Sequence, residues 1–376
     1  TGAASVCIGY EAGKNQNCNY STIIGDRAVG SGSLSGDHNT FIGHYSGYTA
    51  TTAVNNTAIG SNSMAAHTTG GNNVALGYGS LALNTTGSNN IAIGAYAYDA
   101  NTTGADCIAI GRDALSAASG VVQVVAIGHE ALKVSTASYC TAVGHQSMDA
   151  NTTGVANVAV GDGTLGSNTT GDHNTAMGHF ALNANTTGSN QTAVGKNALR
   201  ACTSAENTAV GSEAGVQIST GGDNVIVGYA AGYTMTTAGA NTFLGKSAGY
   251  ACNGSDNTYV GQRCAENATT GTGNIAIGKE AAPSSNTASN ECTLGAGNIS
   301  SLRCNDTSIS SLSDRRDKTD IVDLPTGLNF LNTLRPVKFK WQTRDGNIKD
   351  GKIRAGFIAQ ELQEAQKDCD YLDLVM

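Results

Sequence analysis

A short apolar segment that ends in glycine recurs along most of this chain, and its period limits the possible folds. Successive anchoring glycines are 16 to 18 residues apart, and the residue before each is Ile, Val, Leu or Met. A propeller blade needs roughly 40 or more residues, so units of about 17 indicate stacked coils of a β-solenoid, each contacting its neighbours. A helix is disfavoured because Gly recurs at every period. The 18 glycines are Gly9, Gly25, Gly43, Gly60, Gly77, Gly94, Gly111, Gly128, Gly144, Gly161, Gly178, Gly195, Gly211, Gly228, Gly245, Gly261, Gly278 and Gly295.

Each copy of the repeat contains a short strand. Side chains of a strand alternate between its two faces, so Val74 and Leu76 are expected on one face and Ala75 on the other. We expect the large aliphatic residue before the glycine to point into the coil. The row of alanines, replaced in some copies by Phe or Tyr, would then form a second apolar stripe. We expect other copies of the chain to bury this stripe, because a single column of such thin coils would be marginally stable.

Polar turns close the coils. The motif Asn-Thr-Thr-Gly recurs at 84–87, 101–104, 151–154 and 185–188. Asn and Gly tolerate left-handed backbone, and Asn and Thr side chains bond to nearby backbone groups. The motif also matches an N-glycosylation acceptor. Its recurrence at turns favours the backbone role.

The composition changes near residue 300. Residues 301–376 hold 12 of the 21 Lys and Arg residues and the single tryptophan, Trp341. We therefore predict solenoid repeats over 1–298, a Ser-rich linker over 299–312 and a different domain over 313–376. Because the chain begins at Thr1 without a signal peptide, we expect it to be an internal piece of a longer polypeptide.

The charge and hydropathy patterns exclude two classes of function. The net charge of −8 argues against a nucleic-acid surface, which needs clustered Lys and Arg. No run of 18 apolar residues is present, so the sequence predicts no membrane insertion.

The cysteines are predicted to be reduced and to act as small apolar residues. None of the ten forms a Cys-x-x-Cys pair, which argues against a zinc ribbon. Cys107 and Cys140 share a repeat position but lie two coils apart, about 10 Å at the spacing of β-strands. Disulfide bonding needs Cα atoms within about 7 Å. Reduced thiols fit assembly in a reducing cytoplasm.

Four histidines directly follow anchoring glycines: His44, His129, His145 and His179. His129 and His145 should lie on adjacent coils, and a three-fold axis could gather them into a metal or anion site. The simpler interpretation is an exposed position, because Asp162 and three lysines occupy it in other coils. We therefore assign no metal ligands and no cofactor.

The Asn-x-Ala-Ile-Gly pattern of residues 1–300 resembles the head repeats of trimeric autotransporter adhesins. That resemblance implies three chains that form a parallel β-roll around one axis. The adhesin repeat is usually shorter, and the extra residues here fall in the Asn-Thr-Thr-Gly turn. Repeats with such long turns also resemble those of phage tail-fibre proteins.

The segment after residue 312 differs from the repeats. It opens with a Ser-Asp-x-Arg-x-Lys motif at 313–318, followed by a helix candidate at 325–334 and an alternating strand at 337–341. The sequence Ala-Gly-Phe-Ile-Ala-Gln at 355–360 precedes the start of a second helix. In order, these elements closely resemble the self-cleaving intramolecular chaperone of endosialidase tailspikes and other phage fibres. Because that domain normally continues into further helices, we expect 313–376 to be only its beginning.

The resemblance to the chaperone implies trimerisation followed by self-cleavage between Leu312 and Ser313. Ser313 matches the nucleophile of the family and Lys318 its base. A serine hydroxyl needs such a base, and burial or neighbouring cations can lower the pKa of a lysine enough for the role. Candidate supporting residues are Asp314, Arg315, Arg316 and Gln360.

The fold expected from these observations is mainly β. It is a trimeric parallel β-roll or β-solenoid of about 17-residue coils, followed by an incomplete small α+β chaperone domain. The expected function is a structural or receptor-binding segment of a phage tail fibre in the virion, assembled in the host cytoplasm. Its expected partners are two further copies of itself, other tail proteins, and a host surface glycan or outer-membrane receptor.

Two other functions stay open. The first is a bacterial trimeric surface adhesin, which fits less well because such adhesins end in a membrane barrel. The second is a polysaccharide hydrolase, for which paired carboxylates in a cleft would be needed. Single-turnover self-cleavage is the only catalysis that we expect.

Overall fold

The computed structural model describes residues 4–301, 330, 332–340 and 353–366. The chain divides into two compact units, Thr1–Ser301 and Leu302–Met376, and each is considered by itself. No helix in the described parts is long and apolar enough to cross a membrane.

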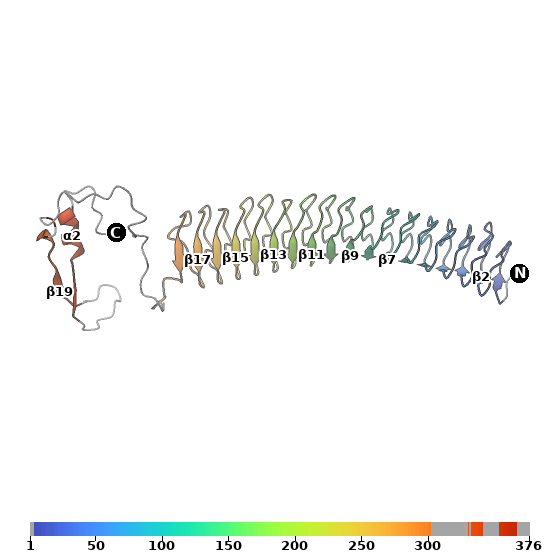
Figure 1. Ribbon diagram of the computed structural model, residues 1–376, viewed down its shortest axis with the longest axis horizontal. Coiled ribbons are helices and arrows are strands. Elements are labelled where there is room, and N and C mark those ends of the chain that lie inside the picture. Colours follow the sequence, from blue (N-terminus) through green and yellow to red (C-terminus); the bar gives the residue numbers. More distant parts are fainter. Residues whose placement is uncertain (1–3, 302–329, 331, 341–352, 367–376) are drawn as a thin grey trace, which may run out of the picture. The chain divides into compact units, whose positions relative to one another are not determined.

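The first unit is a parallel β-solenoid, as predicted. One three-residue strand from each coil joins a single 18-stranded sheet, in which the strands of consecutive coils pair in parallel. Figure 1 shows these strands as a row of parallel arrows along one side of the stacked coils. The strands are β1 (Val6–Ile8), β2 (Thr22–Ile24), β3 (Thr40–Ile42), β4 (Thr57–Ile59), β5 (Val74–Leu76), β6 (Ile91–Ile93), β7 (Ile108–Ile110), β8 (Val125–Ile127), β9 (Thr141–Val143), β10 (Val158–Val160), β11 (Thr175–Met177), β12 (Thr192–Val194), β13 (Thr208–Val210), β14 (Val225–Val227), β15 (Thr242–Leu244), β16 (Thr258–Val260), β17 (Ile275–Ile277) and β18 (Cys292–Leu294).

The orientation of the strands is the reverse of the one expected. The central residue of the strand points into the coil: Ala75 and Phe243 have no exposed surface. The aliphatic residues on either side of it point outward, and Val74 and Leu76 are 37 % and 45 % exposed. The alternation was predicted correctly, but the assignment of its two faces was wrong.

The large buried side chains of most coils come from a turn position. Four residues after the anchoring glycine, Leu81, Leu165 and Met148 are fully buried. Each has left-handed backbone, with φ between 49° and 52°. Left-handed backbone at a residue with a side chain costs roughly 1–2 kcal/mol. Burial of a Leu or Met side chain contributes about 1.5–3 kcal/mol, which offsets this cost.

The anchoring glycines allow close stacking of the coils. Gly60 has φ +138°, and a β-carbon built on it would lie 2.4 Å from the carbonyl oxygen of Gly77 in the next coil. Any side chain here would clash with backbone rather than with a flexible group. Glycine is therefore required at the anchoring position of every coil that has another coil stacked after it.

A ladder of buried asparagines runs through the solenoid beside the strands. The Oδ1 atom of Asn73 accepts hydrogen bonds from the backbone N and the Nδ2 of Asn90, at 3.0 and 3.1 Å. The Nδ2 of Asn73 donates to Oδ1 of Asn56 and to the carbonyl of Gly87, at 3.0 and 2.9 Å. These four bonds use the full capacity of the side-chain amide, which makes its burial favourable.

The asparagines of the Asn-Thr-Thr-Gly turns form a second buried ladder. The Nδ2 of Asn101 donates to Oδ1 of Asn84 at 2.8 Å, and the Nδ2 of Asn84 donates to the carbonyl of Gly87 at 3.0 Å. Both asparagines have no exposed surface. These bonds support the predicted backbone role of the motif over glycan attachment.

The described part of the second unit is a strand pair and a helix. Strand β19 (Val337–Phe339) pairs antiparallel with β20 (Arg354–Gly356), and helix α2 (Ala359–Gln366) follows. Both the strand and the helix start were predicted, although Trp341 lies outside the described residues. Phe330, Asn332 and Thr333 are helical, in the region of the predicted helix at 325–334.

Candidate functional site

The outward face of the sheet is a candidate assembly surface. The position before the anchoring glycine is Ile, Val, Leu or Met in every coil, and Ile8, Leu76, Leu244 and Ile277 are 58 %, 45 %, 47 % and 44 % exposed. Leaving such side chains in water along a whole column is unfavourable. A column that stays apolar although its side chains are exposed or half-buried is typical of a surface that is buried in an assembly.

The predicted self-cleavage residues lie outside the described residues. These are Leu312, Ser313, Asp314, Arg315, Arg316 and Lys318. Gln360 is described: it lies in the first turn of α2 and is exposed.

Gln360 borders a shallow groove of about 580 Å³ between β19 and the start of α2. Val337, Phe339 and Phe357 supply apolar wall, and Phe357 is 49 % exposed. Beside the groove, the Nε of Arg335 donates to the Glu361 carboxylate at 3.1 Å. This ion pair lowers the pKa of Glu361 and links the chain before β19 to the helix.

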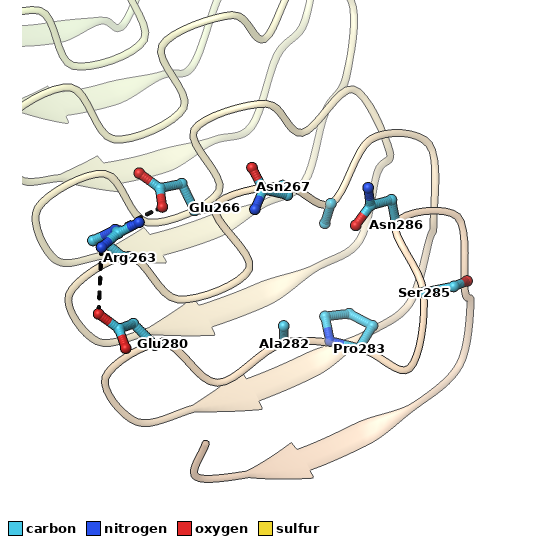
Figure 2. A pocket seen from close by; sticks show the side chains of 9 residues that line it. Arg263, Glu266, Asn267, Glu280, Ala282, Pro283, Ser285 and Asn286 are labelled. Atoms are coloured by element: carbon cyan, nitrogen blue, oxygen red, sulfur yellow. Dashed lines mark hydrogen bonds and ion pairs between the residues drawn. The ribbon is translucent and has the colours of Figure 1, made fainter. Parts of the chain in front are cut away.

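A polar groove of about 320 Å³ lies near the end of the solenoid, at residues 263–286. Figure 2 shows Arg263 between two carboxylates: its Nε bonds Glu266 at 2.6 Å, and its Nη1 bonds Glu280 at 3.4 Å. Asn267 and Asn286 line the other part of the groove (Figure 2). Because both carboxylates share one guanidinium, the groove does not favour the acid and base pair of a glycosidase. Its amides and charges could contact a polar ligand.

The histidines after the anchoring glycines line up along the solenoid, as predicted for adjacent coils. The rings of His129 and His145 are stacked, with centroids 5.3 Å apart. Asp162 is the next residue in the column, and His179 follows it. Asp162 contacts the imidazoles on both sides. Sequence reasoning used Asp162 only as evidence of an exposed position. Its place in the same repeat column was the signal that could have identified it as a partner of the histidines.

The described cysteines are all unpaired, as predicted. Six of them are buried: Cys18, Cys107, Cys140, Cys202, Cys252 and Cys264. Burial raises the pKa of the Cys264 thiol to about 11 and also raises that of Cys107. Cys107 and Cys264 are therefore poor nucleophiles, because the thiolate is the reactive form of a cysteine. Cys7 and Cys292 are exposed, and Cys304 and Cys369 lie outside the described residues.

Comparison with known proteins gives one match. Residues 313–371 match the family model described as chaperone of endosialidase (Peptidase_S74). The match begins at the serine of the Ser-Asp-x-Arg-x-Lys motif and includes β19, β20 and α2. No curated protein and no solved structure matches the chain.

Proposed function

We propose that this chain is a shaft segment of a trimeric phage tail fibre, assembled by a C-terminal intramolecular chaperone that then cleaves itself off. The observation that carries the proposal is the match to the chaperone of endosialidase over residues 313–371, on the C-terminal side of the repeats. A repeat of 16 to 18 residues explains the need for a chaperone. Near-identical coils can pair out of register by one coil, and a C-terminal nucleus would set the register of three chains.

The exposed sheet face supports assembly from copies of one chain. A partner for this face must offer apolar side chains at the same spacing, one row for each coil, over 18 strands. Another copy of the solenoid meets this requirement, because an identical chain has the same spacing of apolar side chains from coil to coil. The resemblance to adhesin heads and to the chaperone family favours three chains around one axis.

Self-cleavage in this proposal uses Ser313 and Lys318. The Oγ of Ser313 attacks the carbonyl carbon of Leu312, while the neutral amine of Lys318 accepts the hydroxyl proton. The peptide bond breaks as its nitrogen takes up a proton, which leaves an ester that water hydrolyses. Arg315 and Arg316 would lower the pKa of Lys318 by repulsion. The exposed amide of Gln360 is a candidate hydrogen-bond donor to the reacting carbonyl, and Asp314 is a candidate supporting residue.

The test compares the denatured and native masses of the full chain with those of Ser313→Ala. We expect the wild type to lose everything from Ser313 onward, the variant to stay intact, and the native species to be a trimer. Ser311→Ala, two residues away, is the matched control and should be cleaved normally. Cleavage of Ser313→Ala at the wild-type rate would contradict the assigned nucleophile, and a monomeric wild type would contradict the fibre.

The same proposal places the chain in the virion and gives it a ligand on the host surface. Unpaired thiols fit assembly in a reducing host cytoplasm. Other tail proteins would hold the segment, and a host surface glycan or an outer-membrane receptor would be its ligand. The polar groove at Arg263 is a candidate contact for such a ligand.

The alternative is a bacterial trimeric surface adhesin. The parallel solenoid and its exposed aliphatic face favour it equally, because both functions need the same trimeric rod. Self-cleavage before Ser313 separates the two, since it belongs to the chaperone of the fibre proposal.

A further inference from the structure

Two columns of side chains border the outward face of the sheet. The post-glycine column contains the residue directly after each anchoring glycine, and the pre-strand column contains the residue two positions before each strand. Because the strands are parallel and pair in register, the two columns run along opposite ends of the strands. Every member of both columns is exposed or half-buried, so both lie on the surface of a single chain.

The two columns carry opposite charges. The pre-strand column contains neither lysine nor arginine, and its four acidic residues are Asp106, Glu206, Asp223 and Asp256. The post-glycine column has four basic residues, which are Arg112, Lys196, Lys246 and Lys279. From Gly178 to the end of the repeats, the post-glycine column contains no acidic residue. The outward face therefore has one acidic edge and one basic edge.

Most of these charges have no oppositely charged partner in their own chain. Arg112 lies 3.6 Å from Asp113, and Lys279 lies 3.8 Å from Glu280. Within residues 4–301, no ion pair involves the other two lysines or the four acidic residues of the pre-strand column. These side chains are therefore available to a partner that docks on the outward face.

The symmetry of an assembly decides which columns meet. Rotation about an axis parallel to the solenoid keeps every coil at its own height. It places the post-glycine column of one chain beside the pre-strand column of the next chain, so the basic edge meets the acidic edge. In an antiparallel pair each column would meet its own copy, and like charges would repel. The charges therefore favour parallel copies.

The spacing of the charges also distinguishes one register from another. With the coils of neighbouring chains level, each of the four basic residues has a pre-strand acid of the next chain in the same or an adjacent coil. Arg112 and Asp106 both belong to the coil of β7, and Lys246 in the coil of β15 has Asp223 one coil before it and Asp256 one coil after it. The flexible four-carbon stem of a lysine can span the ~4.8 Å between adjacent coils.

A shift by one coil loses one of these pairings in either direction. Lys279 has no such acid when its chain moves one coil toward the C-terminus of the neighbour, and Lys196 has none when the chain moves one coil the other way. The level register also suits the two acidic members of the post-glycine column, Asp26 and Asp162. Each has a pre-strand histidine of the next chain one coil away, and these are His38 and His173.

We propose that the two charged columns make this face a docking surface for further copies of this chain, held parallel and with their coils level. The inference rests on the proposed function, because it takes the trimer as given and adds what selects its direction and register. Exposed ion pairs individually add little stability. Complementary charges around an apolar interface instead select the orientation of the partner and speed its association.

The first test reverses the basic column, with a chain that carries Lys196→Glu, Lys246→Glu and Lys279→Glu. Both edges are then acidic. The share of trimer in native mass spectra of the full chain should fall at least about threefold at low salt, and part of it should return at high salt, where charges are screened. Opposite edges, and with them the trimer, should be restored when the same chain also carries Glu206→Lys, Asp223→Lys and Asp256→Lys.

The matched control changes the net charge equally but outside both columns, with Lys14→Glu, Lys133→Glu and Arg200→Glu. Its share of trimer should equal that of the wild type. Circular dichroism of each variant checks that the solenoid is folded.

The second test reads the register by carbodiimide cross-linking, which joins a lysine amine directly to a contacting carboxylate. The two columns are separated by three-residue strands about 10 Å long, so a direct link between them joins two chains. We expect links from Lys246 to Asp223 and to Asp256. Links from Lys246 to Glu206, or from Lys196 to Asp223, join residues two coils apart and would show a shifted register.

The outcomes separate this inference from the proposed function. A monomeric wild type would contradict the trimeric fibre and this inference together. A trimeric wild type whose share of trimer is unchanged by reversal of the basic column would overturn the inference alone. Links that show only a shifted register would also overturn it while the fibre proposal stands.

Discussion

Gly249 packs directly against the ring of Phe243 in the same coil. A β-carbon built on Gly249 would lie 2.5 Å from Cε2 of that ring, and the same relationship holds for Gly47 and Phe41 at 2.4 Å. Other coils reverse the sizes: Ala176 occupies the strand centre and Leu182 the position four residues after the anchoring glycine, which is the position of Gly249, and both are fully buried. The core of each of these coils therefore holds one large side chain, which comes either from the strand centre or from the position four residues after the anchoring glycine.

This relationship predicts compensation between two substitutions. Phe243→Ala should cost about 3–5 kcal/mol through the cavity, and Gly249→Leu alone should cost about 1–3 kcal/mol through overpacking. The double variant reproduces the pairing of Ala176 with Leu182 and should recover most of the loss. The measurement is a double-mutant cycle from denaturant midpoints, and additive costs would show that the two positions do not share space.

The asparagine ladder predicts a large cost for removing one rung. Asn73→Ala leaves the backbone N–H and one side-chain N–H of Asn90 without an acceptor, and each buried unpaired group costs about 1–3 kcal/mol. We expect a loss of at least ~2 kcal/mol in unfolding free energy by denaturation. Asn267→Ala, at an exposed position, should change it by less than about 0.5 kcal/mol. Equal losses of unfolding free energy in the two variants would contradict a stabilising role for the asparagine ladder.

His67 predicts a dependence of stability on pH. It is fully buried, with Nε2 2.9 Å from the Gly70 carbonyl and Nδ1 3.1 Å from Nδ2 of Asn84, and burial lowers its pKa. The unfolded chain then binds a proton that the folded chain resists. Neutral His67 therefore makes its full contribution to the free energy of unfolding above the unfolded pKa of about 6.5. This contribution is lost as the pH falls below that value toward the lower pKa of the folded state.

His67→Asn places the residue of the next coil, Asn84, at this position. We expect its thermal midpoint to fall less between pH 7.5 and pH 5 than that of the wild type. His173→Asn, at an exposed histidine, is the control and should behave as the wild type. If His67→Asn keeps the wild-type pH dependence, another group is responsible.

The outward aliphatic column predicts sensitivity of assembly to charge. Leu76→Glu combined with Leu244→Glu should convert the proposed trimer to monomers by native mass, because carboxylates are costly to bury at an interface. Circular dichroism should stay unchanged, since both residues are exposed in a single chain. Thr86→Glu with Thr237→Glu, at exposed turn positions, should leave the trimer intact. A trimer that survives the Leu substitutions would place the interface on another face.

Several elements could be predicted from sequence because their signals are local. The strand at 337–339 followed from alternation, and the helix that begins at Ala359 followed from the Gly-Phe-Ile-Ala-Gln motif. The position of His129 and His145 on adjacent coils followed from the repeat period alone, and the structure adds that their rings are stacked. The pairing of Gly249 with Phe243 did not, because it depends on where a turn residue is directed across the coil.

The sequence by itself determined the period, and with it the parallel stack, the required glycines and the alignment of equivalent residues. Only the tertiary structure decided which strand face is inside. Alternation with a period of two is the same whether Ala75 or Leu76 points inward, so it cannot distinguish the two faces. The bend at the anchoring glycine makes that choice: it brings Leu81 and Asn84 into the coil, and the space left opposite them admits an alanine. The aliphatic residues are therefore left outside, where assembly can bury them.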